Sequence, residues 1–223
     1  EKILEEFPKN INNIGNKFSS SVERKLSLND SKKFSLETNN FINYLNSQEF
    51  IQFLQDITDV KEALIPDPYL IGGGLHELKN DGHLNIHADF NLHPMMKLDR
   101  ILNILIYLNK NWKEDYGGSL QLWDSKMTRC EKKILPIFNK SVIFSTTDLS
   151  YHGNPDKIKH PKNISRKSIA MYYYTNGRPS KEKYLGEHST IFRKRPNTND
   201  EDGNIEFKKL FGNFFYRKIK KIR

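Results

Sequence analysis

The stretch His83-Leu-Asn-Ile-His-Ala-Asp-Phe90 has the alternating pattern of a β-strand. Successive side chains of a strand point to opposite faces, so His87 and Asp89 are expected to share one face. An imidazole and a carboxylate placed in this way can both reach one divalent ion. A second imidazole from a distant strand would complete the facial triad that holds non-haem Fe(II). The candidate is His152, in Ser150-Tyr-His-Gly-Asn-Pro155.

On its own, the His-x-Asp pair is a weak motif, because a neighbouring His and Asp more often form a surface hydrogen bond than a metal site. His83 and Asn85 share the expected face of His87 and are predicted to line the mouth of a pocket. The remaining histidines are expected to be surface or hydrogen-bonded side chains and not ligands. With His83, this group comprises His76, His93, His160 and His188.

Two later strands add polar groups at positions expected to be buried. Residues 100–109 are almost wholly apolar, which is typical of a strand buried on both faces, so Asn103 and Tyr107 must find partners in the protein or in a ligand. Further on, alternation places Arg166 and Ser168 on one face of a strand. A guanidinium and a hydroxyl in this arrangement can grip one carboxylate.

The first part of the chain has a different pattern. Residues 1–36 are polar and irregular and are expected to form short helical pieces and loops. From Thr38 onward, apolar residues recur every three to four positions, and Ser47 matches the N-cap of a second amphipathic helix. The apolar stripe of that helix is predicted to lie in the core: Phe50, Phe53, Leu54 and Ile57.

After Pro66-Asp-Pro68 the chain has many short strand patterns separated by glycine turns. A strand is expected over residues 69–78, where Gly72-Gly-Gly74 predicts a bulge or a close approach. These patterns predict an α+β, mainly β protein with a double-stranded β-helix (jelly-roll) core and N-terminal helices packed on one sheet. The predicted regions are a helical support at 1–66, the core at 67–178 and a C-terminal extension at 179–223, which ends in a helix and a basic tail.

Taken in order, these features resemble the Fe(II)/2-oxoglutarate-dependent oxygenases, and within them the prolyl-4-hydroxylase-like branch. The resemblance covers roughly residues 69–175. It rests on the His-x-Asp pair, the run Arg100-x-x-Asn-x-x-Ile-Tyr-Leu-Asn109-x-x-Trp112, the motif Gly117-Gly-x-Leu120, the distal His and the Arg-x-Ser strand.

The resemblance implies an enzyme that hydroxylates a C–H bond of a prolyl residue or of a small polar or glycan-type molecule. It implies Fe(II), 2-oxoglutarate and O2, with ascorbate as reductant and with succinate and CO2 as coproducts. His87, Asp89 and His152 would ligate the iron, and Arg166 would pair with the distal carboxylate of 2-oxoglutarate. The other implied cosubstrate contacts are Ser168, Tyr107, Asn103 and Leu120.

The sequence departs from the family pattern in three places. Collagen-type prolyl hydroxylases have Lys where Arg166 stands, and the gap between His152 and Arg166 is longer than in many relatives. Leu78 stands where some relatives have Tyr. These departures weaken an inference about the substrate more than one about iron.

The composition constrains partners and compartment. The net charge is +9, but Lys and Arg are scattered apart from residues 216–223, which are expected to be a solvated end and not a strong nucleic-acid site. The single cysteine, Cys130, fits a reducing, cytoplasmic compartment. No apolar run has the length needed to cross a bilayer. A small-molecule or peptidyl substrate is the expected partner, and nothing indicates the oligomeric state.

Two other functions fit the same residues. A non-catalytic jelly-roll module would bind a sugar or a peptide and keep a vestigial metal site. A cupin-type metalloenzyme would use the metal without 2-oxoglutarate. The intact triad together with Arg166 favours the oxygenase over both.

Overall fold

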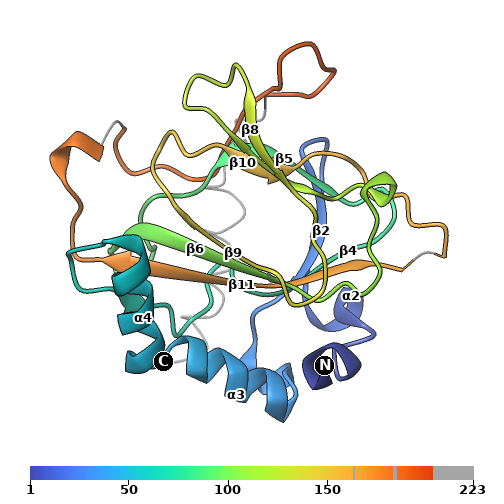
Figure 1. Ribbon diagram of the computed structural model, residues 1–223, viewed down its shortest axis with the longest axis horizontal. Helices are drawn as coiled ribbons and strands as arrows, with labels where there is room; N and C mark the ends of the chain where they lie inside the picture. Colours follow the sequence, from blue (N-terminus) through green and yellow to red (C-terminus); the bar gives the residue numbers. More distant parts are fainter. Residues whose placement is uncertain (163, 183–184, 203–223) are drawn as a thin grey trace, which may run out of the picture.

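The computed structural model describes residues 1–162, 164–182 and 185–202, and its strands join in one curled antiparallel sheet (Figure 1). The strands are β1 (Asn16–Ser19), β2 (Glu23–Leu28), β3 (Ile65–Pro66), β4 (Gly74–Leu78), β5 (His83–Ala88), β6 (Asp99–Tyr107), β7 (Leu120–Trp123), β8 (Cys130–Ile134), β9 (Ser141–Ser145), β10 (His152–Asn154), β11 (Arg166–Thr175) and β12 (Ile191–Phe192). The helices are α1 (Lys2–Glu5), α2 (Ile11–Ile14), α3 (Leu36–Leu45) and α4 (Gln48–Thr58), with 3-10 turns η1 (Ser31–Lys33), η2 (Glu114–Tyr116) and η3 (Ser180–Glu182).

The sheet forms two walls that face each other (Figure 1). One wall has the strand order β4-β11-β6-β9, and the other has the order β5-β10-β7-β8. β2 pairs with both β4 and β5 and so joins the two walls at one side. In the first of these walls, strands from the two halves of the chain alternate, as in a jelly roll, and the predicted mainly β jelly-roll fold is confirmed.

Helices α3 and α4 cover the outer face of the β11–β6 wall (Figure 1). Alternation along β11 turns Ile169, Met171 and Tyr173 toward the helices, and the Tyr173 hydroxyl donates a hydrogen bond to the Leu45 carbonyl at 2.7 Å. The other face of β11, which carries Arg166, is thereby turned to the inside of the barrel.

The N-cap prediction for α4 is confirmed, and the prediction for its apolar stripe is right for two of the four residues. The Ser47 hydroxyl accepts a hydrogen bond from the Phe50 amide at 3.3 Å, as an N-cap does. Leu54 is buried and the partly buried Phe50 packs against the core, whereas Phe53 and Ile57 are 48% and 52% exposed. The sheet contacts only a narrow part of this helix, so the spacing of apolar residues in the sequence predicts more buried side chains than the structure has.

Two segments that were expected to be irregular contribute strands. Residues 16–28 hold β1 and β2, and residues 191–192 form β12, which pairs with β5. β2 escapes a search for apolar alternation because Glu23, Lys25 and Ser27 occupy its inward positions. The predicted strand over 69–78 begins only at Gly74, and the predicted terminal helix lies outside the described residues.

Candidate functional site

A cavity of about 930 Å³ lies between the two walls of the barrel. Its lining includes the predicted metal residues and most of the predicted cosubstrate residues. Those on the lining are His87, Asp89, His152, Arg166, Ser168, Asn103 and Leu120. The fold therefore brings to one cavity side chains that are up to about eighty positions apart in sequence.

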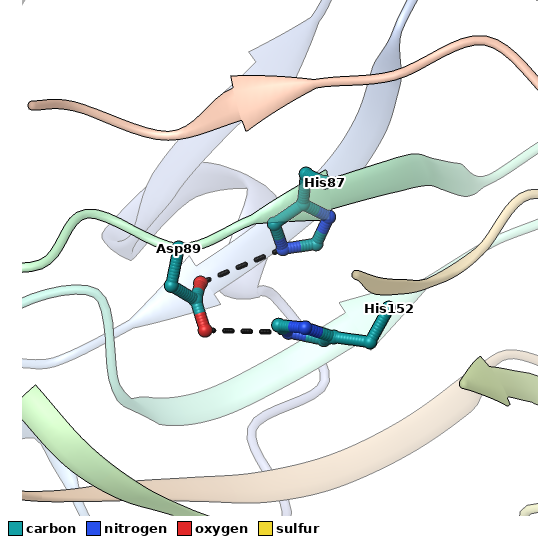
Figure 2. A group of neighbouring side chains, drawn as sticks. All are labelled: His87, Asp89 and His152. Carbon is teal, nitrogen blue, oxygen red and sulfur yellow. Dashed lines mark ion pairs between the residues drawn. The ribbon is translucent and has the colours of Figure 1, made fainter. Parts of the chain in front are cut away.

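The predicted triad converges at one point of this cavity (Figure 2). β10 lies beside β5, with His152 directly opposite His87 in the antiparallel register, and Asp89 follows the end of β5. The Nε2 atoms of His87 and His152 lie 3.5 Å and 3.3 Å from the two carboxylate oxygens of Asp89. One ligand atom from each residue lies within 4.8 Å of the others.

Backbone carbonyls fix the tautomers of both imidazoles. The Nδ1 atom of His87 lies 2.8 Å from the Asn85 carbonyl oxygen, and that of His152 lies 3.0 Å from the Ser150 carbonyl oxygen. A carbonyl only accepts, so each Nδ1 carries the proton and each Nε2 presents a lone pair toward Asp89. Burial lowers the pKa of His87, which favours the neutral form that a metal needs.

Arg100 and Asn103 hold the carboxylate of Asp89 from its other side. The Arg100 guanidinium lies 3.0 Å from Oδ2 of Asp89, and the Asn103 amide donates to the same oxygen at 2.8 Å. Burial alone would raise the pKa of Asp89, but the charge of Arg100 outweighs it and keeps this pKa well below its usual value. Asp89 is therefore an anion over the whole physiological pH range.

These groups fit a divalent metal. Two neutral imidazole nitrogens and one carboxylate oxygen form the donor set of the facial triad of non-haem iron sites. Both rings have a second contact to a backbone carbonyl, which is the usual support of a metal-bound histidine. The ligand roles themselves remain a prediction.

The opposite end of the cavity contains a buried cation without an anion. Arg166 is 3% exposed, and among the described residues no carboxylate lies within ion-pair distance of it. Its Nε atom donates to the Gly118 carbonyl at 2.9 Å, and its guanidinium carbon lies 4.9 Å from the centre of the Tyr107 ring. Burial lowers the pKa of Arg166, yet an arginine stays protonated at neutral pH.

Tyr107 adds an orphaned polar atom at this end. Its hydroxyl is buried and finds no hydrogen-bond partner in the part of the chain that is described. Burial also raises the pKa of Tyr107, so the hydroxyl stays a neutral donor. Tyr107 packs against Arg166 behind the cavity wall, whereas Ser168 and Leu120 lie on the wall itself. An anionic ligand with a carboxylate would satisfy both Arg166 and Tyr107.

The other histidines have hydrogen-bond partners, as expected. His93 and His160 are hydrogen-bonded, and His188 lies 3.0 Å from Asp148. His76 has the Gly72 carbonyl as a partner at 3.0 Å, and His76 and His188 both line the cavity. The prediction that His83 and Asn85 line the pocket mouth is wrong, because neither is on the cavity lining and the His83 ring contacts the carbonyls of residues 21 and 81.

Sequence reasoning missed two parts of the cavity wall. The inward face of β2 contributes Glu23 and Lys25, which form an ion pair of 3.2 Å. The mouth segment, residues 187–192, crosses beside β5 and places the Phe192 ring 5.5 Å from the His87 ring. The polar residues at alternate positions, Glu23, Lys25 and Ser27, were a usable signal for β2, whereas no local pattern marks a two-residue strand such as β12.

Comparison with known proteins finds one matching family model and one related curated protein. Residues 73–174 match the family model of the 2OG-Fe(II) oxygenase superfamily. A stretch of 79 residues is 29% identical to prolyl 3-hydroxylase OGFOD1 of the mouse; it covers 34% of this chain and 14% of the mouse protein.

Solved structures with the same fold are more distant in sequence. A prolyl hydroxylase of Trichoplax adhaerens, solved with a peptide fragment of a hypoxia-inducible-factor oxygen degradation domain, is 18% identical with a TM-score of 0.50 over 84% of this chain and 83% of that one. HygX of Streptomyces hygroscopicus, solved with nickel, 2-oxoglutarate and hygromycin B, is 12% identical with a TM-score of 0.50 over 85% and 89%. Both support the jelly-roll fold of the chain.

Proposed function

Residues 73–174 of this chain match the 2OG-Fe(II) oxygenase superfamily, and from that premise we propose that the chain hydroxylates a C–H bond of a prolyl residue or of a small polar molecule. Fe(II), 2-oxoglutarate and O2 are the cofactor and cosubstrates that the family implies. Ascorbate is the proposed reductant, and succinate and CO2 are the proposed coproducts.

The single observation that carries the proposal is the placement of Arg166 and the triad in one cavity. His87, Asp89 and His152 would hold iron through two imidazole nitrogens and one carboxylate oxygen. Arg166 would bind the distal carboxylate of 2-oxoglutarate, with the Tyr107 hydroxyl as a further donor. When bound, the iron supplies the means to activate O2 and to oxidise a C–H bond.

The protein's own part is positioning and exclusion of water. Arg166 and Ser168 would orient 2-oxoglutarate along the cavity, and Leu120 would pack on its carbon chain. The mouth segment, residues 187–192, would limit access of bulk water to the reacting atoms.

Two observations bear on the substrate class. Aromatic and apolar groups at the mouth, among them Phe90 and Tyr172, favour a compact ring such as that of a prolyl residue. The Glu23–Lys25 pair on the inward face of β2 favours a polar, hydrogen-bonding molecule. The mouse relative is named a prolyl 3-hydroxylase, and HygX was solved with hygromycin B, so both substrate classes are included in the proposal.

The direct test is formation of succinate from 2-oxoglutarate with Fe(II), ascorbate and O2, screened against prolyl peptides and against amino- and hydroxyl-bearing small molecules. Substrate-stimulated succinate formation, with one oxygen atom added to the substrate, supports the proposal. A protein that binds metal but forms no succinate with any member of the panel would be the non-catalytic module. Turnover that is unaffected when Arg166 is replaced by Met would identify the cupin-type reaction.

None of the helices in the described residues combines the length and the apolar character needed to cross a bilayer.

A further inference from the structure

We propose that Asn103 is a positioning residue for the carboxylate of Asp89 and thereby decides which oxygen of Asp89 faces the metal. This inference rests on the proposed function, because it assumes that the triad holds a metal. It differs from the cosubstrate contact that the resemblance implies for Asn103.

The amide of Asn103 is used on both of its ends. Its Nδ2 atom donates to Oδ2 of Asp89 at 2.8 Å, and its Oδ1 atom accepts from Nε of Arg100 at 2.9 Å. A guanidinium only donates and a carboxylate only accepts, so the amide has a single orientation that satisfies both neighbours. Arg100 thereby fixes the direction in which Asn103 points its donor.

Arg100 is itself held rigidly. Its guanidinium carbon lies 3.5 Å from the centre of the Tyr172 ring and 4.6 Å from that of Phe90, and the residue is 1% exposed. The Tyr172 hydroxyl donates to the Gly72 carbonyl at 2.9 Å, which anchors one of these rings. Rings, guanidinium and amide thus form a chain of contacts that ends on Oδ2 of Asp89.

The two oxygens of Asp89 consequently have different surroundings. Each oxygen faces one imidazole nitrogen with a lone pair: Oδ1 lies 3.5 Å from Nε2 of His87, and Oδ2 lies 3.3 Å from Nε2 of His152. Oδ2 in addition accepts from Asn103 and lies 3.0 Å from Arg100. Oδ1 therefore keeps its acceptor capacity for a cation, and the carboxylate would act as a one-oxygen ligand.

The side chain of Asn103 lines the cavity, and its amide nitrogen and its carbonyl oxygen each have a partner in the protein. These two contacts fix the orientation of the amide between Arg100 and Asp89. A threonine has a shorter side chain with one hydroxyl and could not bridge Arg100 and Asp89 in the same way. The asparagine is thus suited to holding Asp89.

The test replaces Asn103 by Leu, which has a similar volume and no donor, and measures Mn(II) affinity by calorimetry without 2-oxoglutarate. Loss of such a supporting contact typically weakens metal binding by about 10- to 100-fold, and we expect an effect in this range. The matched control is Asn154→Leu. Asn154 lines the same cavity, but its buried Nδ2 atom has no hydrogen-bond partner in the described structure. We expect its Mn(II) affinity to stay within about twofold of the wild type.

Asn103→Thr is the second variant. It is expected to lose Mn(II) affinity as well, because the threonine hydroxyl cannot bridge Arg100 and Asp89. Circular dichroism and urea unfolding of the metal-free protein establish that each variant is folded. Unchanged Mn(II) affinity in a folded Asn103 variant, with weaker binding of 2-oxoglutarate to the Mn(II)-loaded protein, would overturn the inference and establish the cosubstrate role.

The same titration separates this inference from the proposed function. Wild-type protein that binds Mn(II) tightly but forms no succinate would contradict the proposed reaction, while the effect of Asn103→Leu on Mn(II) affinity would still support the positioning role. Wild-type protein that binds no Mn(II) would overturn both.

Discussion

The two ends of the cavity are built on opposite principles. At the metal end every charged group has a partner within the protein: Asp89 faces Arg100, Asn103 and both imidazoles. At the other end, Arg166 is just as buried, but no carboxylate of the described residues neutralises it, and the Tyr107 hydroxyl is unpartnered.

This difference separates a site that is assembled before its ligand arrives from one that its ligand completes. At the metal end, partners within the protein hold the donor atoms close together, and no buried charge there is left unpaired. Arg166 instead carries the desolvation penalty of a buried, uncompensated cation, and a dianionic ligand would relieve it. A substitution at the metal end should therefore lower both the stability of the ligand-free protein and its ligand binding. A substitution of Arg166 should lower ligand binding without lowering the stability of the ligand-free protein.

The largest effect is expected for Asp89→Ala. Removal of this carboxylate leaves the buried Arg100 without its anion, and breaking a buried pair in this way costs about 3–5 kcal/mol of unfolding free energy. Urea unfolding of the metal-free protein and Mn(II) titration should show both lower stability and loss of metal binding. Asp115→Ala, which removes an exposed carboxylate, is the control. Equal stability of Asp89→Ala and the wild type would show that Arg100 does not depend on Asp89.

The next largest effect is expected for Arg166→Met, which should weaken 2-oxoglutarate binding without lowering the stability of the ligand-free protein. Loss of one partner of a buried, hydrogen-bonded charge pair costs about 2–5 kcal/mol in binding, so affinity for 2-oxoglutarate should fall by roughly 30-fold or more. The ligand-free protein should be as stable as the wild type or more stable by about 1 kcal/mol, because an unpaired buried cation is gone. Urea unfolding and calorimetry measure the two quantities. A large loss of stability without a change in 2-oxoglutarate affinity would reverse the assignment of this end.

A smaller effect concerns His76, whose ring lies on the cavity wall. Burial, aided by the nearby cations Lys25, Arg166 and Arg100, lowers the pKa of His76 to about 3. An unfolded histidine titrates near 6.5, so below that pH the unfolded chain binds a proton that the folded protein does not. Stability should then fall as the pH decreases from about 6.5, by at most about 1.4 kcal/mol per pH unit for this group.

The matched variant is His76→Gln, compared with the wild type by urea unfolding of the metal-free protein at pH 7 and pH 5. Because the ring is partly exposed to the cavity, we expect the loss of stability between these pH values to be about 1 kcal/mol smaller in the variant. His87, whose pKa is also lowered, contributes equally to both proteins. Identical pH dependence of variant and wild type would mean that His76 titrates normally in the folded state.

The smallest effect lies away from both ends of the cavity. Ser47→Ala removes the N-cap of α4 and should cost about 1 kcal/mol of stability. α4 packs on the outer face of the β11–β6 wall, so Mn(II) and 2-oxoglutarate affinities should stay unchanged. A change in either affinity would show that the helices influence the cavity through the wall.

How far the sequence predicts this molecule depends on the range of the interactions involved. The strand holding His87 and the N-cap at Ser47 follow from local periodicity and hydrogen-bonding preference, and the structure contains both. The approach of His152 to His87 was predictable only through the resemblance to a family, because strand pairing across sixty-five positions leaves no local signal.

What the sequence did not predict is how polar side chains share partners. Asn103 was expected to face a cosubstrate, but its amide lies between Arg100 and Asp89, and only the register of β6 against β11 and the path of the chain after β5 place it there. β2 was missed because Glu23 and Lys25 face a cavity, where an apolar pattern is not required. Single-strand patterns predict which side chains face inward, and they do not predict which of them meet.

We propose that one cavity holds a metal at His87, Asp89 and His152 and the distal carboxylate of 2-oxoglutarate at Arg166. Calorimetric titration of 2-oxoglutarate into the metal-free and the Mn(II)-loaded protein tests this arrangement. We expect binding at a one-to-one ratio that requires Mn(II) and is lost in Arg166→Met. Binding that is equally strong without Mn(II), or absent from a protein that has bound Mn(II), would contradict it.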